Sequence, residues 1–207
     1  MAELHKIYLF RMTHIENISH ILDFGITHYS SLNHNPNYHS IGDGSLIWSR
    51  NNFILNNGAG LGSYIPFYFG PRMPMLFVIQ NGFNGVKTIS PEQIVYCITS
   101  VAEILKHKLR FVFTDGHAVD ALTEQYDISQ IDNLENIVDF KAVSARYWKD
   151  ENDLDLKRRK EAEFLVENDV PCSAILGYAV FSNNSKRLLA SYGIEEKQIV
   201  VKPDYYF

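Results

Sequence analysis

Residues 161–166 of the chain read Glu-Ala-Glu-Phe-Leu-Val and directly follow the basic run Lys157–Lys160. The small or apolar residues at the even positions alternate with two glutamates and a leucine, which is the period-two pattern of a β-strand. Glu161 and Glu163 therefore share one face of the predicted strand. A carboxylate on the wall of a cleft acts as a general base or stabilises a developing positive charge, whereas on a solvent-facing strand it stays solvated beside the basic run. The residues alone leave both interpretations open.

The N-terminal segment predicts a strand followed by a helix. Ile7–Met12 suits a short strand, and Thr13–Glu16 has the spacing of a capping box, in which the two end residues satisfy each other's backbone donors. Isoleucines at helical spacing follow, and Gly25 is predicted to end the helix. His14 falls at the junction, where a histidine either reaches a ligand or packs as a structural residue.

The middle of the chain carries two unusual segments. Ser30–Ser45 is a polar loop that contains His39, and Arg50 follows it after a short stretch. Tyr64–Met75 reads Tyr-Ile-Pro-Phe-Tyr-Phe-Gly-Pro-Arg-Met-Pro-Met, and its prolines predict a rigid, shaped loop rather than a helix or a paired strand. An arginine beside such loops suits a phosphate through bidentate contacts, and a surface ion pair is the alternative.

The remaining pattern predicts an α+β fold with many short strands and few helices. Ser100–Glu103 is a second capping box, and it begins a helix that is expected to end near Lys108. Asp115–His117 is a predicted turn with a helix beginning near His117, and residues 127–150 are expected to be helical or irregular. Further strands are predicted at Leu76–Ile79, Ile94–Ile98, Arg110–Thr114, Ile175–Phe181 and Gln198–Val201.

The composition excludes several classes of protein. The 207 residues are 46% hydrophobic, which suits one folded domain spanning residues 1–207 and excludes a disordered chain. The net charge of −5 provides no basic excess for general nucleic-acid binding. With two cysteines, no secretory signal and no apolar run near the ~20 residues of a membrane span, the chain is expected in the cytoplasm and away from membranes.

Common cofactor and metal motifs do not fit this sequence. Glycines at 58, 60 and 62 do not lie between a strand and a helix of a βαβ unit, which argues against a dinucleotide fingerprint. The eight histidines show neither His-Glu-x-x-His nor zinc-finger spacing, so no dedicated metal site is expected. Cys172 has no evident histidine partner and is interpreted as an inert thiol.

Taken in order, several segments resemble the DarT family of DNA ADP-ribosyltransferases, which are toxins of bacterial toxin–antitoxin systems. The matching segments span nearly the whole chain and are Tyr8–His14, Ile41–Asp43 with Arg50 after it, Tyr64–Met75, Phe113–Ala118, Arg146–Trp148 and Arg158–Val166. The most specific of them are the aromatic–proline segment, the stretch Phe-Thr-Asp-Gly-His-Ala and the stretch Ala-Glu-Phe-Leu-Val.

The resemblance implies an ADP-ribosyltransferase fold, in which a split antiparallel β-sheet with peripheral helices forms a cleft for NAD. It implies that NAD is a co-substrate and that no metal takes part. Glu163 matches the catalytic carboxylate of the family, and Arg50 matches an arginine that acts on the NAD phosphates and on catalysis. The other positions that match contacts to NAD are Thr13, His14, Tyr68, Met75 and His117.

The reaction that the resemblance implies is transfer of ADP-ribose to a base of single-stranded DNA. Residues expected at the DNA are His39, Lys157, Arg158 and Glu161. The family often has Gln where this chain has Glu161, so the acceptor base, guanine or thymine, stays open, with Ile41–Asp43 favouring guanine. The expected partner is an antitoxin with an ADP-ribosyl-hydrolase module. The alternatives are an RNA, protein or water acceptor, and a non-catalytic module that binds single strands.

Overall fold

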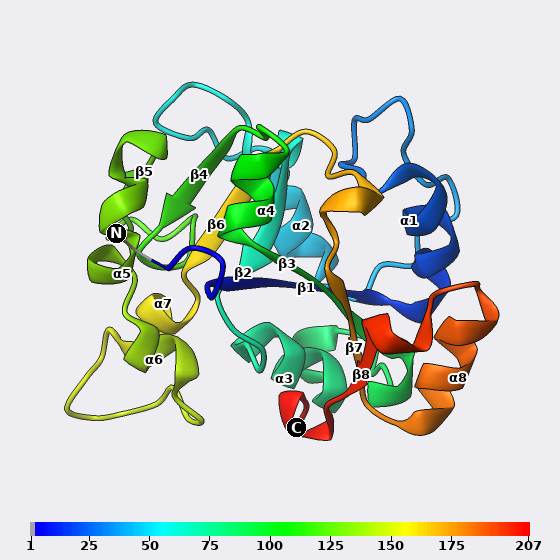
Figure 1. Ribbon diagram of the computed structural model, residues 1–207. Helices are drawn as coiled ribbons and strands as arrows, with labels where there is room; N and C mark the ends of the chain where they lie inside the picture. The colour runs from blue at the N-terminus through cyan, green and yellow to red at the C-terminus, as the bar shows by residue number, and fades with distance from the viewer. Residues whose placement is uncertain (1–2) are drawn as a thin grey trace.

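The computed structural model describes residues 3–207, which form one eight-stranded sheet in the order β5-β4-β6-β2-β1-β3-β7-β8 (Figure 1). Every neighbouring pair of strands is antiparallel except β7 with β8. The strands are β1 (Tyr8–His14), β2 (Tyr64–Tyr68), β3 (Ile94–Ser100), β4 (Phe111–Thr114), β5 (Gln125–Tyr126), β6 (Glu163–Glu167), β7 (Gly177–Val180) and β8 (Ile199–Val201).

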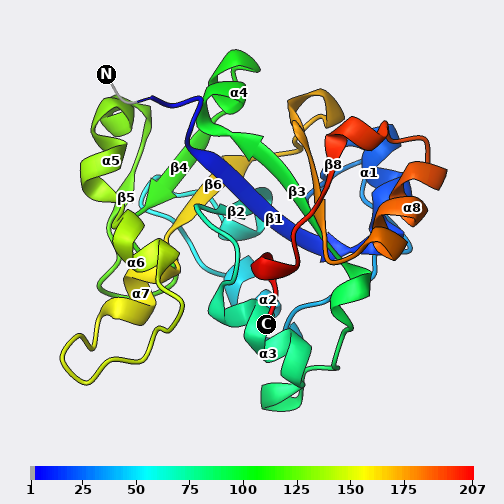
Figure 2. The same ribbon diagram turned by 60° about the horizontal axis from the view of Figure 1, so that its bottom comes forward.

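Short helices surround this sheet. They are α1 (Ile18–Phe24), α2 (Gly44–Asn51), α3 (Pro74–Asn81), α4 (Val101–Lys106), α5 (Leu134–Ile137), α6 (Phe140–Ser144), α7 (Leu156–Lys160) and α8 (Asn183–Ser191). In two views, α5, α6 and α7 gather near β4 and β5, while α1 and α8 lie at the opposite end (Figures 1 and 2). The predicted α+β architecture is confirmed. None of the helices within residues 3–207 is long and apolar enough to cross a membrane.

The sheet is split in its middle, between β1 and β2. β1 pairs with β3 along all seven of its residues but with β2 only where Phe10 meets Tyr68. The carbonyl of Pro66 faces β1, where it accepts a hydrogen bond from Arg11 Nη1 at 3.0 Å. A strand residue directs its N–H and C=O to the same side, so the N–H that proline lacks also falls on the β1 side. The expected split antiparallel sheet is therefore confirmed, and Pro66 gives it a local cause.

Residues 64–68 correct the predicted rigid loop, because they form the strand β2. Its register with β6 runs over five positions, from Tyr64 opposite Glu167 to Tyr68 opposite Glu163. The proline inside β2 is tolerated because the donor it lacks would face the split rather than β6. Only the residues between β2 and α3 remain as loop.

The predicted strand at Leu76–Ile79 is wrong, because this segment lies in α3. Pro74 occupies the first helical position, where its missing N–H is not needed, and Gly82 ends the helix with φ +68°. Leu76 and Ile79 are both fully buried and lie about one turn apart. A short apolar run fits either period, and here the flanking proline and glycine decide for a helix.

The two predicted capping boxes have different outcomes. Ser100 accepts a hydrogen bond from the backbone N–H of Glu103 at 3.2 Å and begins α4, as predicted. The first box is wrong, because His14 rather than the threonine before it caps the following turn, with Nδ1 accepting from the Glu16 N–H at 3.2 Å. β1 extends through His14, which moves the cap by one residue.

Two other boundaries differ from the prediction. The polar loop ends at Asp43, because the Asp43 carboxylate accepts from the backbone N–H groups of Ser45 and Leu46 and caps α2 there. Within the described chain no helix begins near His117, and residues 115–124 form turns and bends. Both differences bear on the site, since α2 carries Arg50 and the turn carries His117.

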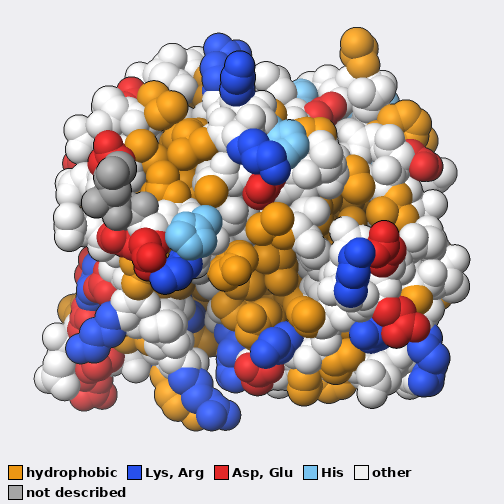
Figure 3. Space-filling model, in the orientation of Figure 1, with side chains coloured by type: hydrophobic (Ala, Val, Ile, Leu, Met, Phe, Trp, Pro, Cys, Tyr) orange, Lys and Arg blue, Asp and Glu red, His pale blue; other side chains and the backbone are white. Residues whose placement is uncertain are grey.

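Hydrophobic side chains cover both faces of β6. Phe164 packs with Phe67 and Phe113 in the main core, whereas Leu165 belongs to a second, smaller cluster. The solvent-facing alternative for Glu163 is therefore excluded, and its side chain is fully buried. Hydrophobic side chains also gather near the centre of the face that Figure 1 turns to the viewer (Figure 3).

Gly25 ends α1 with φ +79°, as the sequence predicts. A Cβ there would lie 2.2 Å from the carbonyl oxygen of Val170, whereas a Cβ at Gly58, with φ +83°, would meet open space. We expect Gly58→Ala to lower the free energy of unfolding by about 1 kcal/mol through backbone strain, and Gly25→Ala to lower it by more, because a clash is added. Urea denaturation measures both variants, and equal losses would contradict this account.

Candidate functional site

The carboxylate of Glu163 lies at the start of β6 and has 0% exposed surface. Its Oε1 accepts hydrogen bonds from the backbone N–H of Ala118 and from Arg50 Nη1, each at 3.0 Å, and its Oε2 accepts from Arg50 Nη2 at 2.6 Å. Burial by itself raises the pKa of Glu163, but the Arg50 charge and these hydrogen bonds outweigh burial, so the pKa is lowered. The carboxylate is therefore charged at neutral pH.

Arg50 reaches Glu163 from the last turn of α2, where the Asp43 cap fixes the start of the helix. The guanidinium binds both carboxylate oxygens, a bidentate geometry that is among the stronger charge-assisted contacts. Its side chain is 17% exposed, so the ion pair is largely removed from water. Burial by itself lowers the pKa of Arg50, yet the charge of Glu163 raises it overall. The arginine therefore stays charged.

The turn after β4 holds the Ala118 N–H against the carboxylate. Thr114 accepts from the Glu163 N–H at 3.0 Å and donates to the Gly116 carbonyl at 2.7 Å. A Cβ at Gly116 would lie 2.4 Å from Nη1 of Arg158, so the close approach of this guanidinium requires glycine. Thr114 and Gly116 thus fix the turn that presents the Ala118 N–H to Glu163.

Arg158, one of the residues expected at the DNA, supports that turn in the structure. Its guanidinium binds the two carboxylate oxygens of Asp155 at 2.7 and 2.9 Å and Asp115 Oδ1 at 3.0 Å. The side chain is 12% exposed. Lys157, one residue earlier on α7, is exposed and keeps its charge at the surface.

Lys160 shows that the basic run is not one solvated patch. It is 1% exposed and donates to the carbonyls of Val143 at 2.8 Å and Ala145 at 2.7 Å. Burial lowers the pKa of Lys160 to about 8. This side chain anchors the end of α6 to the end of α7, shortly before β6 begins.

Two further titratable groups lie beside Glu163. Burial raises the pKa of Glu161 to about 7, while the charge of Lys157 lowers it and that of Glu163 raises it. Tyr68 is the register partner of Glu163 on β2, and burial followed by the Glu163 charge raises the pKa of Tyr68. Below a pH of about 7, Glu161 is therefore neutral, as is Tyr68, and both lie beside the charged carboxylate of Glu163.

His117 is the last member of the group of side chains around Glu163. Its Nε2 lies 3.4 Å from Arg50 Nη1, and because arginine only donates, the histidine nitrogen accepts. Burial lowers the pKa of His117, and the opposed charges of Glu163 and Arg50 follow as smaller causes. The imidazole is therefore neutral at neutral pH, with its proton on Nδ1.

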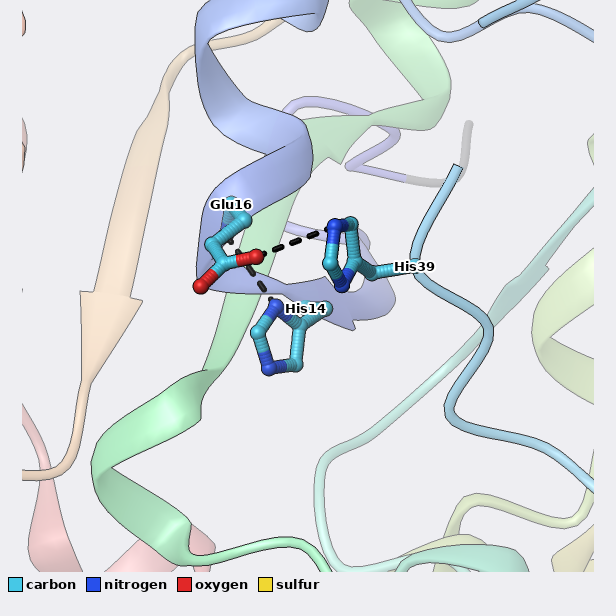
Figure 4. Close-up of side chains that lie close together, drawn as sticks. All are labelled: His14, Glu16 and His39. Carbon is cyan, nitrogen blue, oxygen red and sulfur yellow. Dashed lines mark hydrogen bonds and ion pairs between the residues drawn. The ribbon is translucent and has the colours of Figure 1, made fainter. Parts of the chain in front are cut away.

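A second group lies at the far end of β1 (Figure 4). His14 is 6% exposed, and its ring stacks on that of His39 with centroids 5.1 Å apart. The Asn17 side chain joins the two segments, since it donates to Thr13 Oγ1 and to the His39 carbonyl and accepts from the His39 N–H. Burial lowers the pKa of His14. The polar loop is thus tied to β1 at residue 39.

The structure brings the predicted residues together in part. Glu163, Arg50 and His117 are in contact, and Tyr68 pairs with Glu163 in the sheet. Met75 lies in the first turn of α3 and packs, partly buried, against the main core. The second group lies on the other half-sheet, so the predicted NAD residues fall on both sides of the split.

Three residues of the site are not predicted by sequence motifs. Ala118 acts through a backbone N–H, which no side-chain pattern reveals, and Thr114 acts through a neighbouring strand. Asn17 lies in the turn after β1, and its amide donates to Thr13 Oγ1 at 3.0 Å. Its link to the polar loop has no counterpart in local sequence.

A family model described as "ssDNA thymidine ADP-ribosyltransferase, DarT" matches residues 10–207. The chain belongs to the DarT family. The DNA ADP-ribosyl transferase of Escherichia coli O127:H6 is 33% identical over 190 residues, which are 90% of this chain and 86% of that relative. A DNA ADP-ribosyl transferase–DNA ADP-ribosyl glycohydrolase fusion protein of Thermosipho africanus is 28% identical over 200 residues, 96% of this chain and 48% of the fusion.

Two solved DarT structures from Thermus sp. 2.9 share the fold. The complex with ADP-ribosylated ssDNA has a TM-score of 0.82 at 28% identity, covering 97% of this chain and 96% of that one. The complex with NAD+ has a TM-score of 0.79 at 27% identity, covering 100% and 99%. The expected ADP-ribosyltransferase-like fold is confirmed for this DarT-family chain.

Arg50→Met should raise the pKa of Glu163, because burial then acts without the opposing charge. A carboxylate with a lowered pKa stabilises the fold above its ordinary pKa, so this stabilisation is lost in the variant. The free energy of unfolding should fall by about 3–5 kcal/mol at pH 8 and by less at pH 5, where Glu163 takes up a proton. Urea denaturation at both pH values measures the difference.

Arg110→Met is the matched control, because Arg110 also pairs with a glutamate of β6 but is 75% exposed. It should cost about 1 kcal/mol or less at either pH. A loss for Arg50→Met that is the same at both pH values would contradict a charged, buried Glu163.

Glu161→Gln should change how stability depends on pH in this DarT-family chain. Between the ordinary pKa of 4.5 and the folded value of about 7, the folded chain holds a proton that the unfolded chain releases. The contribution of Glu161 to stability is therefore present at low pH and lost as pH rises through that window. Melting temperatures measured from pH 4 to 8 should show the stability of the variant increasing relative to that of the native chain as pH rises. The same pH dependence in both proteins would exclude a raised pKa of Glu161.

Proposed function

We propose that this chain transfers the ADP-ribose unit of NAD to a base of single-stranded DNA and releases nicotinamide, with Glu163 as the catalytic carboxylate. The observation that carries the proposal is a buried, charged carboxylate whose Oε1 is fixed by Ala118 and Arg50. Among residues 3–207 its Oε2 accepts one hydrogen bond, so a lone pair is left for substrate. Family membership supports the activity, since the Thermus relative has been seen with NAD+ and with ADP-ribosylated ssDNA.

Transfer of ADP-ribose requires a carboxylate of this kind. The bond between the nicotinamide nitrogen and C1′ of the ribose breaks, its electron pair leaves with nicotinamide, and positive charge develops on the sugar, as in glycoside cleavage. A fixed negative charge stabilises that state without having to reorganise. A ring nitrogen of the base then bonds to C1′ and gives up its proton, for which Oε2 of Glu163 is the proposed acceptor.

Arg50 has two proposed tasks. Its contacts use three of the five guanidinium N–H groups, two on Glu163 and one on His117, and they orient the carboxylate. The N–H groups that remain are proposed to hold the diphosphate of NAD, to which arginine is well suited.

The other proposed NAD contacts lie on both half-sheets. His14 Nδ1 accepts from the Glu16 N–H, so the neutral ring carries its proton on Nε2 and can donate it to the dinucleotide. His14 lies four residues beyond Phe10, the β1 partner of Tyr68, which is about 13 Å along the strand. An extended dinucleotide bridges such a distance. Thr13, Tyr68, Met75 and His117 complete the proposed set.

Glu161 is proposed to face the acceptor base. In its neutral form it offers an O–H donor for a base carbonyl together with an acceptor oxygen. Thymine and guanine both present a carbonyl beside a ring N–H, so Glu161 suits either. We propose thymine because the matching family model names thymidine, whereas the Ile41–Asp43 segment favours guanine. Fragmentation of the modified oligonucleotide identifies the base.

The DNA strand is proposed to pass the exposed residues His39 and Lys157. A hollow of about 250 Å³ borders α2 and is lined by Tyr29, Ser30, Asn51, Gly60, Gly62 and Ser63. Tyr29 is 83% exposed, and an exposed aromatic ring is a platform on which a base stacks. Single-stranded substrate is required because pairing occupies the reacting edge of a base.

The modification is proposed to be reversed by an antitoxin with an ADP-ribosyl-hydrolase module. The Thermosipho relative joins a DNA ADP-ribosyl transferase to a DNA ADP-ribosyl glycohydrolase in one chain. A mark on DNA bases interferes with copying of the strand, so an unopposed transferase is expected to be toxic.

Glu163→Gln should abolish ADP-ribosylation of single-stranded DNA, by at least about a hundredfold, because the amide keeps the shape but loses the charge. Mass spectrometry of oligonucleotides incubated with NAD measures the gain of one ADP-ribose unit. Glu167→Gln is the matched control on the same strand, since Glu167 pairs with exposed Arg110, and it should keep full activity.

Retained activity in Glu163→Gln would exclude Glu163 as the catalytic carboxylate. NAD consumption without a mass gain on DNA would point to RNA, protein or water as acceptor. Binding of oligonucleotide without any NAD consumption would identify a non-catalytic module instead.

A further inference from the structure

The polar loop and the end of β1 bring together three side chains with metal-binding atoms. His14, Glu16 and His39 each offer one such atom, and these atoms all lie within 4.8 Å of one another. Figure 4 shows the two imidazoles and the carboxylate converging, with His39 arriving from the loop. We propose that the His14–Glu16–His39 cluster binds one divalent transition-metal ion of the zinc class.

The spacing suits such an ion with small adjustments. Zinc takes imidazole nitrogens and carboxylate oxygens at about 2.0–2.2 Å, which puts neighbouring ligand atoms of a tetrahedral site about 3.3 Å apart. His39 Nε2 and Glu16 Oε2 are already 3.0 Å apart. The side chains of His39 and Glu16 are 50% and 54% exposed, so both are free to close on an ion.

The cluster is also fixed by its surroundings. Asn17 binds the backbone of His39 on both its N–H and its carbonyl, each at 2.9 Å, which holds this loop residue opposite β1. His14 is buried and stacked on His39, and its Nδ1 accepts the Glu16 N–H at 3.2 Å. An ion on Nδ1 replaces that long hydrogen bond and keeps the proton on Nε2.

Two histidines with one carboxylate form a ligand set that transition metals prefer, and it leaves a position for water. The 25-residue gap between His14 and His39 hides the set from any spacing rule, which is why the sequence predicts no metal site. The alternative is that His39 and Glu16 form a simple ion pair without a metal. A measurement of metal binding distinguishes these two interpretations.

Visible absorption of Co2+ added to the tag-free, full-length chain tests the site, because tetrahedral Co2+ absorbs strongly. Calorimetry with Zn2+ then gives the stoichiometry. We expect one ion per chain, with affinity reduced about tenfold or more in Glu16→Gln and in His39→Ala. His34→Ala is the matched control, since His34 lies in the same loop but outside the cluster, and it should bind like the native chain. No Co2+ band, or equal binding by Glu16→Gln, would overturn the proposal.

A second measurement concerns activity and rests on the proposed function. Because the ion occupies Nε2 of His39, that side chain is withdrawn from the DNA, so Zn2+ should raise the apparent KM for the oligonucleotide severalfold. Glu16→Gln, which lies outside the proposed catalytic and NAD residues, should keep its KM when Zn2+ is added. An unchanged KM with zinc bound would refute the withdrawal of His39. A chain that is inactive even without zinc would count against the proposed function alone, since the Co2+ measurement needs no turnover.

Discussion

A charged carboxylate without contact to solvent is the constraint on which the rest of the site depends. Moving such a charge out of water costs several kcal/mol, and Glu163 is fully buried at the start of β6. Two elements compensate this cost: α2 brings the Arg50 guanidinium, and the turn after β4 brings the Ala118 N–H. The Asp43 cap of α2 and the glycine of that turn are therefore parts of the site, although neither touches the carboxylate.

Local patterns were enough to predict the elements whose signals are themselves local. The alternation at 161–166 located β6, and Gly25 and Ser100 marked helix ends. The sequence-based predictions failed where residues distant in the sequence determine the local structure. Pro66 sits inside a strand because its missing donor faces the split between the half-sheets, and the far side of that split is β1, where Arg11, 55 residues away, binds the Pro66 carbonyl. No property of the aromatic–proline segment taken alone contains that information.

The candidate site divides in the same way. Family resemblance predicted Glu163, Arg50 and His117, and the structure joins them in one hydrogen-bonded group. The basic run is different, because Lys160 turns inward to the Val143 carbonyl and Arg158 to Asp115. Charge in a sequence indicates solvent exposure only when no buried partner lies elsewhere in the fold, and these partners lie 17 and 43 residues away.

Glu161 and Glu163 show most directly what the fold adds to the sequence. They are the same residue type, two positions apart, and by pattern alone they are equivalent. Arg50 and the Ala118 N–H keep Glu163 charged, whereas burial raises the pKa of Glu161 to about 7. Pairs of carboxyl groups whose environments separate their pKa values in this way take different chemical roles. Glu163 begins β6, whereas Glu161 lies just before the strand as the C-cap of α7, so the predicted alternation over 161–166 holds only from residue 163 onward. Under the proposed function the charged member would stabilise a cationic sugar and the neutral member would donate a hydrogen bond to a base.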